Sequence, residues 1–267
     1  MSESPATGAR AFHIKPLLSR ARGVAFLTLF AALVVYYETS THLWNWGLWG
    51  DVAWIALVLI PAVFGLVLLA LPLRLARGLL PVGAAFAVLA AVLTYADVNV
   101  FANFARLGAA TLIGWWFLGY FETLSWVVLV AAIIPWVDAY SVWRGPTKHI
   151  VENHEHVFSV LSFAFPVPGE HSAANLGIPD LLFFALFLAA SDRFGLRVYA
   201  TWIALVAALG ATIALTVWLE LSGLPALPAI AIGFLLPNAD LLWRRLRGEP
   251  GIGDRTDVAV DAPPNDA

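Results

Sequence analysis

The sequence predicts an all-α fold, a polytopic transmembrane helical bundle of about eight or nine spans. Of its 267 residues, 61% are apolar and only 12% are charged, and the mean hydropathy is +0.81. A soluble domain is nearer half apolar and a quarter charged. The apolar runs are continuous rather than alternating, which favours helices over a β-barrel.

The rest of the composition excludes several classes of site. The chain has no cysteine, so it contains no disulfide framework, no thiolate metal site and no cysteine nucleophile. The net charge of −3 is too small to indicate a nucleic-acid partner.

Apolar segments long enough, or nearly so, to cross a hydrocarbon core of about 30 Å recur along the chain. They cover residues 23–37, 52–73, 79–96, 100–119, 123–143, 176–191, 196–219 and 224–243. The segment 100–119 is the weakest, because Asn103 and Arg106 interrupt it, and 176–191 is short. No small-residue cleavage site follows the first segment, so we expect it to be a retained span.

These segments divide the chain into four parts. Residues 1–22 form an N-terminal segment, and residues 23–119 form an N-terminal group of transmembrane helices. Residues 123–243 form a second group, which contains a polar loop at 144–175. The tail at 248–267 is rich in Gly, Pro and Asp and has little to bury, so we expect it to be disordered.

Basic residues predict the orientation. With an even number of spans and a cytoplasmic start, the outside connections hold only Arg144 and Lys148. The remaining basic residues near segment ends then lie inside: Arg10, Lys15, Arg20, Arg22, Arg74, Arg77, Arg193, Arg197, Arg244, Arg245 and Arg247. Both termini are therefore predicted to be cytoplasmic.

Two aspartates inside apolar segments are the main candidates for chemistry. Asp138 lies near the end of segment 123–143, and Asp180 lies near the start of segment 176–191. A carboxylate at membrane depth costs about 2.5–3.5 kcal/mol on insertion scales, so it is rarely kept without a use. The two segments run antiparallel, and both carboxylates lie about one helical turn below the same membrane face. Equal depth is a condition for the two groups to meet.

Two carboxylates that meet hold one proton between them, because both cannot ionise easily at short range. The ionised partner then draws a proton from water while the protonated partner polarises a carbonyl, which suits peptide hydrolysis. Lone intramembrane aspartates also serve proton or ion pathways, or simply reach the interface. The two aspartates alone leave these alternatives open.

The sequence around Asp180 predicts where its helix begins. Pro179 suits the first helical turn, where its missing N–H is not needed. Asp180 would then lie in that turn, where the helix dipole favours an anion. Gly177 would allow the backbone to approach closely.

A third element begins the last segment, at Leu224-Pro225-Ala226-Leu227-Pro228. Two prolines three residues apart cannot propagate an ordinary helix, and they leave backbone groups unbonded. Within a bilayer such irregular backbone is tolerated only against protein or a watery cavity.

The ordered set of motifs resembles the presenilin and signal peptide peptidase family of intramembrane aspartyl proteases, in a prokaryotic-like form. That family carries an aspartate in one span, Gly-x-Gly-Asp in the next and Pro-Ala-Leu in the last. The matching positions are Asp138, Gly177 with Asp180, and Pro225-Ala226-Leu227. The resemblance covers about residues 130–243. Val137 replaces the family's usual tyrosine, and Pro179 replaces its second glycine.

The resemblance implies an aspartic endopeptidase that cleaves within the membrane and needs no metal or organic cofactor. Its catalytic residues would be Asp138 and Asp180, and its substrate-binding residues Gly177, Pro225, Ala226 and Leu227. Its partners would be single-span membrane proteins or signal-peptide remnants in a prokaryotic plasma membrane. The family usually has nine spans against the eight segments here. The predicted outside position of the 144–175 loop matches signal peptide peptidases and is opposite to presenilins.

Other interpretations stay open. The same aspartates would suit a proton-coupled transporter, or a catalytically silent member that binds transmembrane partners. Gly251-Ile252-Gly253-Asp254 matches the family pattern literally, but it follows the last span and cannot reach membrane depth. A metal site is a weaker alternative to a solvated loop for the acidic and histidine cluster Glu152, His154, Glu155, His156, Glu170 and His171.

Overall fold

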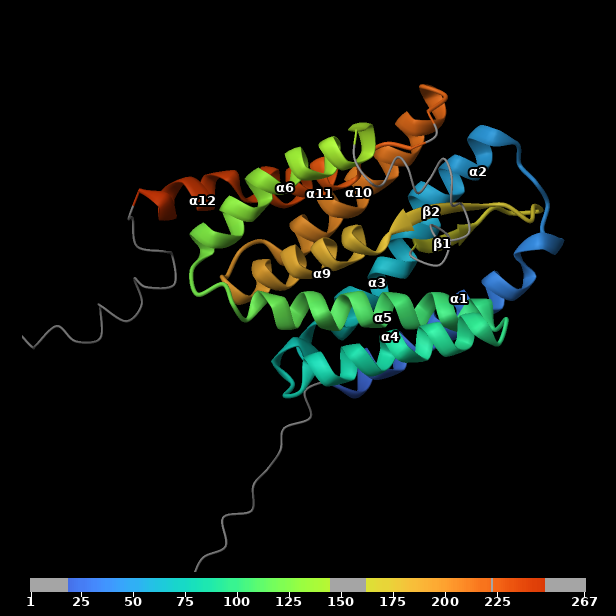
Figure 1. Ribbon diagram of the computed structural model, residues 1–267, viewed down its shortest axis with the longest axis horizontal. Coiled ribbons are helices and arrows are strands. Elements are labelled where there is room, and N and C mark those ends of the chain that lie inside the picture. The colour runs from blue at the N-terminus through green and yellow to red at the C-terminus, as the bar shows by residue number, and fades with distance from the viewer. Residues whose placement is uncertain (1–18, 145–161, 222, 248–267) are drawn as a thin grey trace, which may run out of the picture.

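The structure is a computed structural model that describes residues 19–144, 162–221 and 223–247. Its described part is an elongated bundle of helices with a short β-hairpin near one end (Figure 1). The helices are α1 (Arg20–Thr39), α2 (Leu48–Trp54), α3 (Ile60–Ala70), α4 (Leu79–Tyr95), α5 (Asn99–Leu118), α6 (Leu124–Arg144), α9 (Ile178–Arg193), α10 (Val198–Trp218), α11 (Leu227–Leu235) and α12 (Ala239–Leu246). The strands are β1 (Ser162–Pro166) and β2 (Ala173–Gly177).

Four shorter helical turns, η1 to η4, complete the helical segments. A π-helical turn, η2 (Ile55–Leu59), joins α2 to α3, and a 3₁₀ turn, η3 (Leu71–Leu75), follows α3. The 3₁₀ turn η1 (Ser40–His42) follows α1. A further 3₁₀ turn, η4 (Leu236–Asn238), separates α11 from α12. Proline explains the last break, because Pro237 cannot continue the hydrogen-bonding of α11.

Four helical stretches among the described residues are long and apolar enough to cross a membrane. They are Arg20–His42, Leu48–Leu75, Leu124–Ser141 and Val198–Trp218. The helix Leu79–Tyr95 is apolar but shorter. All eight predicted segments contain helix, which confirms the mostly helical fold, whereas the number of spans stays a prediction.

Helix α9 lies in the middle of the bundle rather than on its surface. It contacts α5, α10 and α11, and every side chain from Phe184 to Ala190 is fully buried. A helix that is apolar all round packs in this way inside a protein. The short segment 176–191 is therefore covered by other helices, and its surface is mostly shielded from lipid.

Aromatic rings and small residues fix the position of α9. The Phe64 ring stacks on Phe184 at 3.9 Å between centroids, and Phe187 stacks on Phe234 at 4.8 Å. On α5, a Cβ at Gly114 would lie 2.6 Å from the carbonyl oxygen of Leu182. Small residues that let helix backbones approach are typical of packing within membranes. These contacts hold α9 against α3, α5 and α11.

The predicted polar loop at 144–175 contains more structure than the sequence indicated. Antiparallel pairing of β1 with β2 places Ser162 opposite Gly177 and Pro166 opposite Ala173. The alternating residues Phe163 and Phe165 are fully buried, so one face of β1 belongs to the core. This part of the predicted loop is a hairpin that packs against the bundle.

Several sequence predictions lie outside the described residues. These are most of the N-terminal segment, the loop residues Lys148, Glu152, His154, Glu155 and His156, and the tail with Gly251–Asp254.

Candidate functional site

The first aspartate joins two helices that are far apart in the sequence. Asp138 lies in α6, and its Oδ2 accepts a hydrogen bond of 3.1 Å from the backbone N–H of Leu227, 89 residues away. Leu227 is the first residue of α11. The first N–H groups of a helix have no partner within the helix, so an acceptor from elsewhere satisfies them. Asp138 therefore caps α11 from a neighbouring helix.

The Pro-Ala-Leu backbone is irregular just before this cap. Pro225 lies outside any helix, Ala226 has φ −89° and ψ −24°, and Pro228 occupies the first turn of α11. Ala226 and Leu227 are buried, whereas Pro225 is half-buried. Because Pro228 has no N–H, the Leu227 N–H is a principal donor at this helix start. The carboxylate of Asp138 is directed at it.

The second aspartate lies where the sequence predicts it, in the first turn of α9. Gly177 precedes the helix in an extended conformation, with φ −61° and ψ 147°, and Pro179 and Asp180 follow in the first turn. Pro179 fits there because N–H groups of the first turn need no helical partner. A carboxylate at this position interacts favourably with the positive end of the helix dipole. The proline that departs from the family pattern is thus compatible with the local backbone.

Gly177 provides space for the carboxylate of Asp180. A Cβ added at Gly177 would lie 3.2 Å from Asp180 Oδ2, and the Gly177 backbone interacts with that carboxylate. Its φ is one that any residue adopts, so the glycine matters here for close approach rather than for conformation.

The structure brings the two aspartates into one neighbourhood. Their carboxylates interact electrostatically, and the helices α6, α9 and α11 contact one another. Both residues have an intermediate exposure. All six residues predicted for the site lie at the neighbouring ends of these three helices or in the backbone that leads into them.

The outer edge of β1 is anchored by side chains of α1 and α5. Asn103 bonds to both the N–H and the C=O of Ala164, each at 2.9 Å. Tyr37 donates to the same carbonyl at 3.0 Å, and Tyr36 donates to the carbonyl of Pro166 at 3.0 Å. Asn103 thus pairs with β1 as a neighbouring strand would. This role of Asn103 was not predicted from the sequence, although an amide inside an apolar segment is a signal for it.

The opposite edge, that of β2, points away from β1. The N–H and C=O of Ala164 face away from β2, towards Asn103. The N–H and C=O of its register partner Asn175 therefore face away from β1, and those of Ala173, two residues earlier, face the same way. Among the described residues, the side-chain amide of Asn175 reaches this edge at 3.5 Å from the carbonyl of Ala173, and the carboxylate of Asp180 reaches it at Gly177. Gly177 is next in phase and leads into Asp180. Within the described residues this edge therefore has no neighbouring strand, and it leads through Gly177 to Asp180.

The described part of the chain contains no group of three acidic, histidine or cysteine side chains that could hold a metal ion. Of the predicted loop cluster, it includes Glu170 and His171. Glu170 accepts hydrogen bonds from Asn45 at 2.7 Å and from Ser172 at 2.6 Å, which attaches the hairpin turn to the chain after α1.

No protein-family model matches the sequence, and a search among curated proteins finds no relative. The described residues define a mostly helical protein, in which four helical stretches are long and apolar enough to cross a membrane.

Proposed function

We propose that this chain is an intramembrane aspartyl protease, an aspartic endopeptidase that hydrolyses peptide bonds within transmembrane segments. The observation that carries the proposal is the contact between Asp138 and Leu227, which links the first aspartate to the Pro-Ala-Leu backbone. The electrostatic interaction of Asp138 with Asp180 adds the second carboxylate to the same site. Three motifs that are separate in the sequence thus support one reaction.

In the proposed reaction the two carboxylates share one proton. The ionised carboxylate removes a proton from a water molecule, whose oxygen attacks the carbonyl carbon of the scissile peptide. The protonated carboxylate donates its hydrogen bond to the carbonyl oxygen and then its proton. The resulting diol collapses with proton transfer to the amide nitrogen, and the C–N bond breaks to give a carboxylic acid and an amine. The pair acts as a unit, so neither role is assigned to one aspartate.

The substrate is proposed to bind as an added strand. A peptide bond inside a helix is inaccessible, so a transmembrane substrate must be extended locally before hydrolysis. The open edge of β2 and the irregular backbone at Pro225–Leu227 both offer main-chain groups near Asp180 and Asp138. Strand addition uses main-chain hydrogen bonds and therefore accepts many sequences. Single-span membrane proteins and signal-peptide remnants fit this mode.

The proposal includes a multi-pass arrangement in a prokaryotic plasma membrane with both termini in the cytoplasm. The uneven distribution of basic residues supports this orientation. It places the hairpin and the aspartates towards the outer face.

The test is cleavage of a single-span reporter protein by the purified chain in lipid vesicles. Asp138→Asn and Asp180→Asn preserve the size of each side chain, and each is expected to abolish cleavage. Asp97→Asn is the matched control, because Asp97 is exposed and has φ 57°, a conformation that asparagine also adopts readily. Cleavage that persists in both site variants would exclude the proposed mechanism.

The cap itself supports a specific second candidate, a catalytically silent protein in which Asp138 only stabilises α11. Asparagine at position 138 retains a side-chain oxygen that can accept the Leu227 N–H. A silent protein would therefore bind a transmembrane partner equally well as wild type or as Asp138→Asn and would cleave it in neither form. A proton-coupled transporter would instead show solute uptake that depends on the aspartates, without proteolysis.

A further inference from the structure

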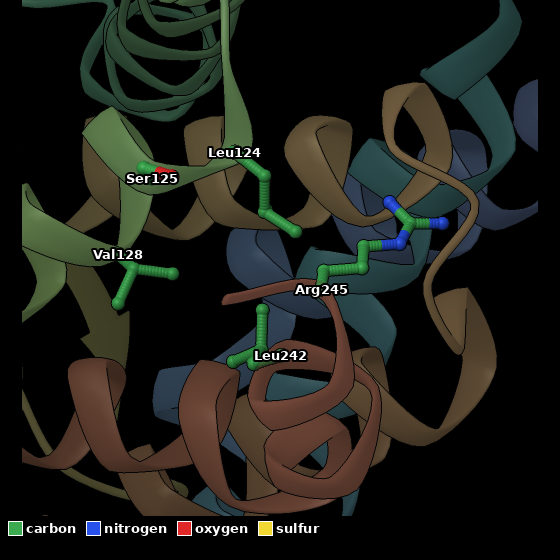
Figure 2. A pocket seen from close by; sticks show the side chains of 5 residues that line it. All are labelled: Leu124, Ser125, Val128, Leu242 and Arg245. Carbon is green, nitrogen blue, oxygen red and sulfur yellow. The ribbon is translucent and has the colours of Figure 1, made fainter. Parts of the chain in front are cut away.

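A small notch lies between the start of α6 and α12, far from the aspartates. Leu124, Ser125 and Val128 of α6 line it together with Leu242 and Arg245 of α12, and it is open to the surroundings (Figure 2). Asp138 lies 14 residues further along α6 than Leu124, which corresponds to about 20 Å at the helical rise. The notch is therefore separate from the proposed active site.

The notch combines an apolar lining with a positive charge. The side chains of Leu124 and Leu242 point into the gap between the two helices. The aliphatic part of Arg245 lies beside this gap, and its guanidinium extends away from the leucines (Figure 2). Arg245 donates from Nη1 to the carbonyl of Phe194. A guanidinium has five N–H donors, so this one bond positions the group and leaves others for a ligand.

Within the part of the chain that the structure describes, no carboxylate compensates the charge around the notch. Arg244, Arg245 and Arg247 are all exposed, and none of them pairs with a carboxylate among the described residues. In contrast, Arg74 pairs with Asp192 at 2.6 Å and Arg197 pairs with Asp240 at 2.7 Å. Arg244 and Arg245 of α12 and Arg247, just after this helix, thus form a positive surface beside the notch.

Trp243 indicates that this surface meets the membrane boundary. Its side chain is 59% exposed, and the guanidinium of Arg247 lies 4.5 Å from the ring centroid. Tryptophan and arginine are enriched where a protein passes from hydrocarbon to headgroups, since each has an apolar part and a polar end. A ligand here would meet both environments at once.

We propose that the notch binds an anionic phospholipid. The phosphate would accept hydrogen bonds from the Arg245 guanidinium in the field of Arg244 and Arg247. The glycerol end of an acyl chain would lie against Leu124, Val128 and Leu242. Both parts of the site require an amphiphile, because a soluble phosphate has nothing to place on the apolar lining. The proposal is independent of the proteolytic activity.

The experiment uses the full chain in nanodiscs that contain equal amounts of phosphatidylglycerol and phosphatidylcholine. Native mass spectrometry after release measures which lipid stays bound. We expect the wild-type chain to retain phosphatidylglycerol preferentially. Arg245→Gln removes the guanidinium that would bond the phosphate, and losing a hydrogen bond between charged groups should reduce the retained phosphatidylglycerol by about tenfold.

Two further variants separate a site from general surface charge. Ser125→Phe fills the notch from an exposed position and keeps every arginine, and it should also reduce retention. Arg77→Gln is the matched control. Arg77 is also an exposed arginine, but it does not line the notch. It lies three residues after Arg74, which pairs with Asp192, two residues before Phe194. This control should retain phosphatidylglycerol as the wild type does.

Two results would overturn the proposal. One is equal retention of both lipids by the wild-type chain. The other is an equal loss in Arg77→Gln and Arg245→Gln, which would indicate a diffuse charge effect instead of a site. If Arg245→Gln fails to fold, Ser125→Phe alone decides between retention and loss.

Discussion

The Oδ2 atom of Asp138 accepts the backbone N–H of Leu227 at 3.1 Å and so fixes the end of α6 to the start of α11. One carboxylate thereby has two functions in the proposed enzyme. It caps a helix that two prolines leave short of internal hydrogen bonds, and it takes part in hydrolysis. The two functions can be separated by substitution.

Asp138→Ala should lower the stability of the folded chain, whereas Asp138→Asn should not. Loss of a capping side chain costs about 1 kcal/mol, and asparagine is as good a cap as aspartate. Thermal unfolding in detergent measures the difference. Both variants should lose cleavage of the reporter. Equal stability of Asp138→Ala and wild type would show that the contact contributes nothing to the fold.

Gly177→Ala should reduce catalysis without unfolding the chain. The new Cβ would lie 3.2 Å from Asp180 Oδ2, so the carboxylate must shift, and small displacements of a catalytic group cost about tenfold or more in rate. The backbone conformation at Gly177 suits alanine, so stability should be kept or slightly raised. The measurement is kcat for the reporter together with the unfolding midpoint. Gly223→Ala, where a Cβ meets nothing within 4 Å, is the control; it should leave kcat unchanged and should keep or slightly raise the unfolding midpoint.

Asn103→Ala should loosen the hairpin. The substitution leaves the N–H of Ala164 without its partner, and a buried unsatisfied group costs about 1–3 kcal/mol. Hydrogen exchange in residues 162–177 should accelerate, and cleavage should fall because β2 leads into Asp180. Tyr37→Phe removes one of two donors to the Ala164 carbonyl, so its effect should be smaller. Unchanged exchange in Asn103→Ala would contradict the anchoring role.

Gly114→Ala should destabilise the packing of α5 on α9. The added Cβ would lie 2.6 Å from the backbone oxygen of Leu182, so the helices must separate. Overpacking of this kind costs about 1–3 kcal/mol. Gly65→Ala is the control, because its Cβ would meet only the end of the Leu29 side chain, at 3.3 Å, which can rotate away. The two unfolding midpoints should differ clearly, and equal midpoints would refute the close contact.

The sequence alone determined the positions of the helices and the local setting of Asp180. Continuous apolar runs specify helices because a backbone in hydrocarbon must bond within its own segment. The start of α9 was predictable for a similar reason, since Gly177, Pro179 and Asp180 act within one turn of chain. The antiparallel relation of Asp138 and Asp180 followed from the two segments that share one connection.

Only the tertiary structure decided what joins these elements. Asp138 meets Leu227 across 89 residues, and Asn103 meets Ala164 across 61. Periodicity and composition report on neighbours along the chain and carry no information about such pairings. The same limit applies to the hairpin, whose strand β1 is stabilised by Tyr36, Tyr37 and Asn103 from two distant helices. It also applies to α9, which is buried because α5, α6, α10 and α11 contact it. The apolar sequence of α9 does not specify which helices cover it.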